Sequence, residues 1–153
     1  MSVLSLLYKL KETERQAGDL YRLIQQTMAV RDPATADLFK RMQSDERIHE
    51  KQVEMALSIY KEAPEQFAPQ PDAIFLIDKV LQKIQEVSAH VERHRQTIMA
   101  AELISLALEI EVDMEERHQS FYIKVKDTQL GALFKNILDA DTEHVTLLKS
   151  QLS

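Results

Sequence analysis

Residues that interrupt helices are scarce in this sequence, and their scarcity constrains the fold more than any other feature. Only 2 of the 153 residues are glycine and 4 are proline. Because these two residue types mark most turns, so few of them in a chain of this length indicate few turns and long helices. No stretch alternates apolar and polar residues with the period of two that a half-buried strand requires. The sequence therefore predicts an all-α fold.

Apolar residues at helical spacing, together with local capping signals, divide much of the chain into four long helices. We expect these helices at about residues 2–30, 33–61, 97–126 and 128–152. Asp32-Pro33 is typical of a helix start, since aspartate caps free backbone N–H groups and proline is tolerated in the first turn. Asp127-Thr128 is expected to form a short turn and cap before the last helix. Both short connections predict antiparallel helical hairpins.

The two predicted hairpins are joined by a segment too long for a tight turn. This crossover covers about residues 62–96 and begins with three prolines within eight residues, which end a helix and favour extended backbone. Apolar residues from 74 to 91 then recur on one side of an accessory helix, with Asp72 as its cap. We therefore expect one domain over residues 1–153, a four-helix bundle with a long crossover that carries an accessory helix on its outside.

Charge and composition exclude several classes of function. The formal net charge is −6, whereas nucleic-acid binding requires clustered lysine and arginine. No apolar stretch approaches the ~20 residues of a membrane span, and the first residues lack the pattern of a signal peptide, so a cytoplasmic location is expected. The chain has no cysteine, which excludes disulfides, thiolate zinc sites and iron–sulfur clusters. Any metal site must use oxygen and imidazole ligands.

Two short pairs place a carboxylate and an imidazole three residues apart on predicted helices. They are Glu46 with His49 and Asp141 with His144. Positions i and i+3 lie on the same face of a helix, one turn apart. Each pair is therefore able to bind one metal ion from a single helix.

The two hairpins repeat one pattern of side chains. On the first helix of each, a glutamate precedes a tyrosine by seven residues, Glu14 with Tyr21 and Glu115 with Tyr122. On the second helix, a phenylalanine precedes the carboxylate of the pair by seven residues. A bundle of two such halves would bring four carboxylates and two imidazoles toward one axis. Buried carboxylates are costly unless they are paired, and a set of this size suits two metal ions.

This ordered set resembles the rubrerythrin-like branch of the ferritin-like superfamily, and the resemblance spans nearly the whole chain. It implies a ferritin-like fold with two metal ions, iron before manganese or zinc. The metal ligands that it implies are Glu14, Glu46, His49, Glu115, Asp141 and His144. It further implies that two tyrosines lie beside the metal ions, Tyr21 and Tyr122.

The sequence also departs from the family pattern. Asp141 stands where glutamate is usual, so its side chain is one methylene shorter. His118 lies one turn after Glu115 and is interpreted as an additional nitrogen ligand, a hydrogen-bond partner of Glu115 or an exposed residue. Glu111, one turn before Glu115, is interpreted as a neighbour of the site or as exposed, with metal ligation as a further alternative. The sequence has no cysteine, so we expect no rubredoxin-type domain of the kind that supplies electrons in full rubrerythrins, and an external electron donor would be needed.

Three functions remain open at this stage. The first is a di-iron oxidoreductase that reacts with peroxide or dioxygen, and the protein is expected to be a homodimer. The second is ferritin-like iron oxidation and storage, which needs a closed shell of subunits. The third is a non-enzymatic helical module that binds a partner, or holds a metal only structurally.

Overall fold

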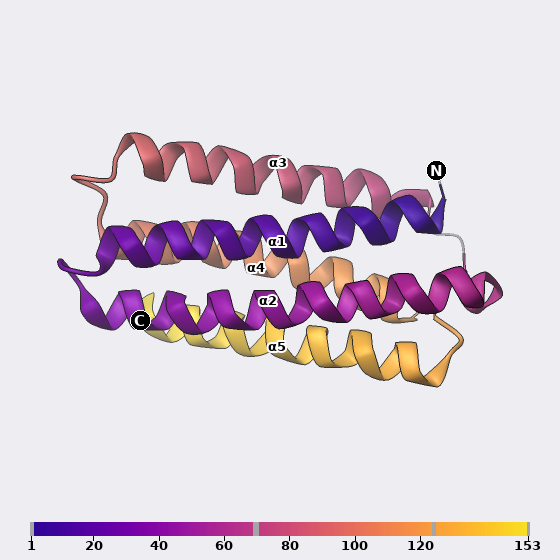
Figure 1. Cartoon of the computed structure of the whole chain (residues 1–153). Helices are drawn as coiled ribbons and strands as arrows, with labels where there is room; N and C mark the ends of the chain where they lie inside the picture. The colour runs from indigo at the N-terminus through magenta and orange to yellow at the C-terminus, as the bar shows by residue number, and fades with distance from the viewer. Residues whose placement is uncertain (1, 69–70, 124, 153) are drawn as a thin grey trace.

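The chain folds into long α-helices that run back and forth along one axis (Figure 1). The computed structural model describes residues 2–68, 71–123 and 125–152, the side chains at 71–74 and 120–123 excepted. Its helices are α1 (Val3–Met28), α2 (Pro33–Glu62), α3 (Pro71–Arg93), α4 (Ala100–Ile123) and α5 (Thr128–Leu152), with a short 3₁₀ turn, η1 (Pro64–Gln66). The predicted all-α class is confirmed. Among the described residues, the only β-type pairing is one bridge between Phe67 and Val125.

Capping side chains fix where the helices begin. The Asp32 carboxylate accepts a hydrogen bond from the backbone N–H of Thr35 at 3.1 Å, and α2 begins at Pro33 as predicted. Asp127 accepts one from the N–H of Leu130 at 2.9 Å, which confirms the predicted start of the last helix. These side chains satisfy backbone N–H groups that have no partner inside the helix.

Helix α4 is shorter than the sequence pattern predicts. It begins at Ala100 rather than at about Thr97. The guanidinium of Arg31 donates to the carbonyl oxygens of Ile98 and Arg95, at 2.8 and 2.7 Å. Arg31 thus binds two carbonyl oxygens of the turn that precedes α4, and no local signal predicts this long-range contact.

The crossover differs from the prediction at its start. Pro64 begins the 3₁₀ turn η1, whereas extended backbone was expected there. Helix α3 begins at Pro71, so Asp72 lies inside its first turn and does not precede it. Both prolines occupy first-turn positions, where a missing N–H costs little.

The topology is that of two antiparallel hairpins joined by a crossing helix. In Figure 1, α1 and α2 run in opposite directions, as do α4 and α5, and these pairs pack together. Helix α3 runs the length of the molecule and packs against α1 and α4. Because the crossover returns the chain to its starting end, α2 and α4 run parallel, and α2 also contacts α5.

Helix α3 is a structural part of the core. Its apolar face is buried at Ile77, Val80, Ile84, Val87 and Val91. Four of these side chains belong to the same apolar cluster as residues of α1, α2 and α4. The prediction that this helix has one apolar face is confirmed. The helix was expected on the outside of the bundle, but its apolar face completes the core.

The buried apolar side chains form two separate clusters. One contains the second half of α1 and the first half of α2, from Ala17 to Met42. The other contains the first residues of α1, the second half of α2 and the start of α5. Buried polar residues lie between the two clusters along α1 and α2, at Thr13, Glu14, Glu46 and His49. Across the described part of the chain, no helix combines the length and apolarity needed to cross a membrane.

Candidate metal centre

Seven ionisable side chains are buried where the two apolar clusters meet. Four helices supply them, and each supplies one carboxylate that is 0% exposed. The set consists of Glu14 from α1, Glu46 and His49 from α2, Glu111 and His118 from α4, and Asp141 and His144 from α5. Burying such groups costs several kcal/mol each unless charges of opposite sign compensate them.

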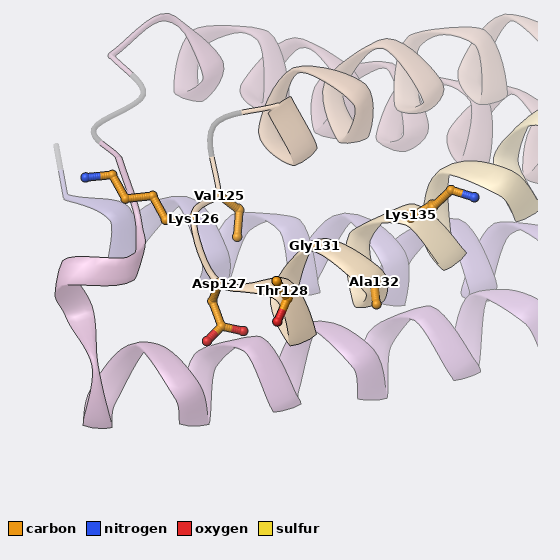
Figure 2. Close-up of a pocket in the computed structure, with 7 residues that line it drawn as sticks. All are labelled: Val125, Lys126, Asp127, Thr128, Gly131, Ala132 and Lys135. Carbon is orange, nitrogen blue, oxygen red and sulfur yellow. The ribbon is translucent and has the colours of Figure 1, made fainter.

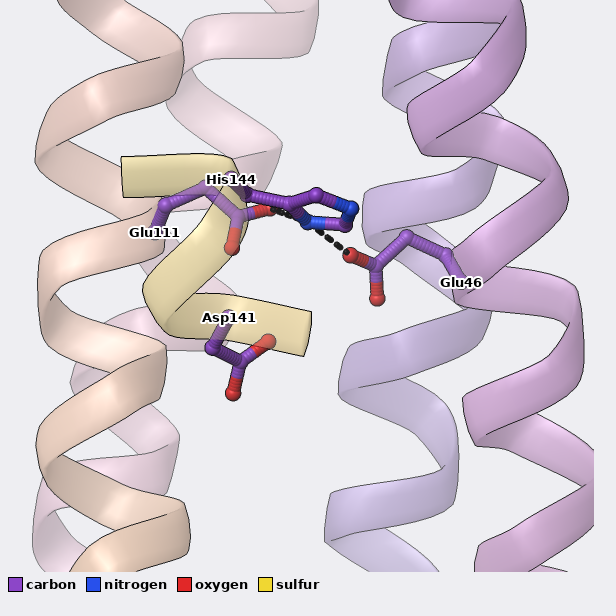
Figure 3. Close-up of side chains that lie close together, drawn as sticks. All are labelled: Glu46, Glu111, Asp141 and His144. Atoms are coloured by element: carbon purple, nitrogen blue, oxygen red, sulfur yellow. Dashed lines mark ion pairs between the residues drawn. The ribbon is translucent and has the colours of Figure 1, made fainter. Parts of the chain in front are cut away.

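Four of these side chains form the first of two groups with the ligand atoms to hold a metal ion, which is shown in Figure 3. One ligand atom from each of Glu46, Glu111, Asp141 and His144 lies within 4.8 Å of all the others. His144 Nδ1 lies 3.4 Å from Glu111 Oε1 and 3.5 Å from Glu46 Oε1. We call this set of three carboxylates and one imidazole group A.

A second group lies beside it. Ligand atoms of Glu14, Glu46 and His49 also lie within 4.8 Å of one another. His49 Nδ1 is 3.3 Å from Glu46 Oε2 and 3.4 Å from Glu14 Oε2. We call this set group B. Because Glu46 belongs to both groups, it stands where a carboxylate would bridge two ions.

The buried atoms of the cluster that make no hydrogen bond fit a bound cation. Each member of group A has one buried atom without a hydrogen bond: Glu46 Oε1, Glu111 Oε2, Asp141 Oδ1 and His144 Nδ1. In group B, both carboxylate oxygens of Glu14 are also buried without a hydrogen bond. Buried polar atoms are nearly always paired, so this concentration points to a ligand that the protein itself does not supply. Carboxylate and imidazole donors suit iron, manganese or zinc.

His144 is oriented by a residue outside both groups. Its Nε2 lies 2.8 Å from Oδ2 of Asp45, a partly exposed residue on α2. If Nε2 carries the proton and donates it to Asp45, Nδ1 presents its lone pair to group A. Carboxylates that hold metal-binding histidines in this way fix both the tautomer and the ring orientation. Asp45 could have been recognised from the sequence as a neighbour of the site, because it directly precedes Glu46.

The structure also places the internal repeat in a different register on α4. Tyr21, seven residues after Glu14, donates its hydroxyl to Glu111 Oε1 at 2.6 Å. His118, seven residues after Glu111, places Nε2 at 2.8 Å from Glu14 Oε1. Each half therefore has a carboxylate and, two turns later, a polar ring that reaches the carboxylate of the other half. The matching pairs are Glu14 with Tyr21 and Glu111 with His118.

Burial and mutual charge shift the pKa values of the cluster strongly. Burial lowers the pKa of an imidazole, but the surrounding carboxylates outweigh it and raise the pKa of His49 to about 12, of His118 to about 10 and of His144 to about 11. Burial raises the pKa of Asp141 to about 7, although His118 opposes the shift. Burial and the charge of Glu46 also raise the pKa of Glu111.

These shifts describe how the cluster balances its charge without an ion. Protonated imidazoles offset the buried carboxylates. A metal ion that takes a nitrogen ligand must displace such a proton, so binding should release protons and strengthen as the pH rises.

Five of the six predicted ligands come together in the two groups. They are Glu14, Glu46, His49, Asp141 and His144. The sixth, Glu115, is only half-buried and belongs to neither group, and Glu111 occupies the position expected for it.

The remaining predicted residues have mixed outcomes. Tyr21 lies beside the cluster as expected, whereas the side chain of Tyr122 falls outside those described. His118 is 1% exposed and Glu111 is 0% exposed, so the interpretations of either as a surface residue were wrong. His118 contacts Glu14 and Asp141, where Glu115 was one of the expected partners.

A separate hollow lies on the surface at the turn between α4 and α5 (Figure 2). Its volume is about 510 Å³, and it is lined by Val125, Lys126, Asp127, Thr128, Gly131, Ala132 and Lys135. None of these residues belongs to either metal-binding group. The hollow therefore gives no sign of being an entrance to the buried cluster.

Comparison with models of known protein families, with curated proteins and with solved structures finds no match to this chain. The functional assignment therefore depends on the geometry and chemistry of the cluster.

Proposed function

We propose that this chain is a ferritin-like dinuclear metal protein of the rubrerythrin type. On this proposal it acts as an oxidoreductase on peroxide or dioxygen and takes its electrons from an external donor. One observation supports the proposal above all. Four helices each deliver one fully buried carboxylate to a single cluster, with a histidine one turn after the carboxylate on α2 and again on α5. This is the donor set of di-iron and di-manganese carboxylate bundles, with Asp141 in place of one glutamate.

The arrangement of the helices agrees with this assignment. Two antiparallel hairpins joined by one long crossover, with α2 and α4 parallel, match the connectivity of ferritin-like bundles. The crossover here is itself helical and packs against α1 and α4. Iron is the favoured metal because the proposed reaction requires an ion that changes its oxidation state, which zinc does not.

Bound iron would supply the two electrons that, with two protons, reduce peroxide to water, and the external donor would restore them. The residues of the chain would perform the remaining tasks. Glu46 is placed to link the two ion positions, since both groups share it. Tyr21 holds a proton on its hydroxyl, 2.6 Å from Glu111. Asp45 orients His144 and connects the cluster to the partly exposed surface of α2.

Metal content and reactivity test this proposal directly. Elemental analysis of freshly purified protein should find about two transition-metal ions per chain. Iron-loaded protein, reduced without oxygen and mixed with peroxide, should develop the absorption of ferric iron. Glu46→Gln, which removes the shared ligand charge, should lower the iron content and the yield of this reaction. A wild-type chain that retains no transition metal after loading and gel filtration would overturn the proposal.

Sedimentation measures the number of subunits in the assembly and so distinguishes an oxidoreductase from an iron-storage protein. We expect a homodimer, and this stays a prediction. A closed shell of many subunits would instead favour iron storage, because storage needs an enclosed volume. Zinc alone in the purified protein, with a loss of stability on chelation, would favour a structural metal in a non-enzymatic module.

A further inference from the structure

Two histidines that the buried cluster does not use lie at the end of α3. His90 is in the last turn of this helix, and His94 follows it by four residues. The backbone N–H of His94 donates to the carbonyl oxygen of His90 at 3.1 Å, so the helical turn continues between them. Side chains four residues apart on a helix lie on the same face. Histidines paired at this spacing are able to bind one metal ion from a single turn.

The two imidazole rings are already close together. Their centroids are 4.6 Å apart, and their planes are inclined by 49°. Ring nitrogens bind zinc at about 2.0–2.1 Å, so the centroids of two imidazoles on one ion lie roughly 4.5–5 Å apart. The separation of the rings of His90 and His94 is therefore suited to two ligands of one ion.

A carboxylate from the next helix completes the set. Glu102 lies in the first turn of α4 and places Oε1 at 2.8 Å from Nε2 of His90. The ring N–H donates in this contact, since a carboxylate only accepts, and a metal ion would take the place of that proton. Carboxylate oxygens bind zinc at about 2.0–2.2 Å, so an oxygen and a nitrogen on one ion lie roughly 3–3.5 Å apart. A small movement of the two side chains would admit the ion.

This surface set is open to solvent and separate from the buried cluster. The side chains of His90 and Glu102 are 35% and 50% exposed, and His94 is exposed as well. Among the described residues, only groups A and B have all their ligand atoms within 4.8 Å of one another, so the ring of His94 must turn to converge with the other two. An exposed side chain changes rotamer readily. Two imidazoles and one carboxylate favour zinc, nickel or copper over magnesium or calcium.

We propose that His90, His94 and Glu102 form a surface site for Zn²⁺ or a similar divalent ion that prefers imidazole. The ion joins the end of α3 to the start of α4. It also steadies the turn between these helices, because the backbone N–H groups of Thr97 and Ile98 donate to the carbonyl oxygen of His94 at 3.0 and 2.8 Å. This site does not depend on the dinuclear function proposed above.

Nuclear magnetic resonance of the imidazole nitrogens tests the proposal residue by residue. The chain has five histidines, and single variants assign their ring signals in isotope-labelled protein. When Zn²⁺ is added to metal-free protein, ring signals of His90 and His94 should shift at the same Zn²⁺ concentration. Mg²⁺ should leave both unshifted, because it prefers oxygen ligands. Glu46→Gln, which alters the buried cluster, should leave both shifts as in wild type, so this result is independent of the dinuclear proposal.

Variants of the other two ligands measure their contribution to binding at His90. His94→Gln and Glu102→Gln should each raise the Zn²⁺ concentration for half of the His90 shift by at least ~10-fold, since loss of even an outer partner of a metal site costs that much. Glu92→Gln is the matched control, because it removes the same charge from an exposed glutamate that pairs with Arg95, and it should titrate as wild type does. Circular dichroism checks the helical content of each variant.

Three outcomes would overturn the proposal. The first is no shift of either ring in millimolar Zn²⁺, which would leave the contact between His90 and Glu102 as a hydrogen bond only. The second is a shift of the two rings at unrelated concentrations, which would mean separate binding to single side chains. The third is an equal effect of Glu102→Gln and Glu92→Gln, which would reduce the role of Glu102 to its charge.

Discussion

Glu111 and Glu115 show how a single helical turn decides whether a carboxylate joins the buried cluster. Both lie on α4, four residues apart, and the sequence pattern favoured Glu115 because Tyr122 follows it at the spacing that separates Glu14 from Tyr21. In the structure Glu111 is 0% exposed and belongs to group A, whereas Glu115 is half-buried and outside both groups. The two residues therefore form a matched pair for mutagenesis.

On the proposed function, Glu111→Gln should remove one charged ligand from group A and weaken the binding of a metal ion there by about 10-fold or more, by analogy with the loss of groups that support a metal site. Glu115→Gln is the control and should bind Mn²⁺ as wild type does. Equilibrium dialysis against Mn²⁺ measures both. Equal weakening in the two variants, or weakening only in Glu115→Gln, would contradict the observed register.

The prediction of Glu115 in the place that Glu111 occupies was wrong for a physical reason. Both glutamates fall on neighbouring parts of one helix surface, and the rotation of α4 that turns Glu111 inward depends on packing against α3 and α5. The glutamate–tyrosine spacing does not contain that information. A different local spacing did contain it, since His118 follows Glu111 by seven residues. A histidine in place of a tyrosine concealed this repeat.

At the scale of helices, the sequence predicted best those starts that carry their own capping signal. Asp32-Pro33 and Asp127-Thr128 carry their own capping chemistry, so the starts of α2 and α5 were correct. The start of α4 depends on the contact between Arg31 and two distant carbonyl groups, and it was misplaced. The apolar face of α3 did not predict how closely this helix packs into the core.

Removal of the α2 cap should lower the stability of the protein measurably. Asp32→Ala loses the hydrogen bonds to the N–H and hydroxyl of Thr35, and the free energy of unfolding should fall by about 1 kcal/mol. Asp37→Ala, at an exposed position of the same helix, is the control and should change it by less than about 0.5 kcal/mol. Urea denaturation compares the two. Equal effects would show that the cap contributes nothing specific.

The role of α3 in the core is tested by truncating one of its buried side chains. Ile84 is 1% exposed within the larger apolar cluster, so Ile84→Ala should cost about 2–5 kcal/mol of unfolding free energy. Gln82→Ala, on the exposed side of α3, should cost less than about 0.5 kcal/mol. Thermal denaturation of metal-free protein measures both. A loss below about 0.5 kcal/mol for Ile84→Ala would mean that α3 is only an accessory covering.

At the scale of the whole molecule, the buried cluster makes stability depend on pH. Although burial opposes it, the neighbouring carboxylates raise the pKa of His118 to about 10 and of His144 to about 11. An unfolded imidazole loses its proton near pH 6.5, so between pH 6.5 and 10 the folded chain holds more protons than the unfolded chain. The free energy of unfolding of metal-free protein should therefore fall as the pH rises through this window.

The metal-loaded protein should show a weaker fall or a rise, because ions displace the same protons and bind more tightly at higher pH. Urea denaturation at several pH values between 6 and 9, with and without a chelator, measures the difference. We expect the stabilisation by metal to widen steadily with pH. A metal-free protein that gains stability from pH 7 to 9 would contradict the protonation of the buried imidazoles.

The division of the apolar core into two clusters has a consequence for how the protein opens. The two clusters are apolar, whereas the layer between them holds buried carboxylates and imidazoles, so the cohesion of this layer would depend on the ions proposed to bind there. Native-state hydrogen exchange should therefore report two separately protected regions after chelation and one cooperative unit after loading. Bound ions would therefore couple the two apolar clusters, and their removal would let the two ends of the molecule fluctuate independently.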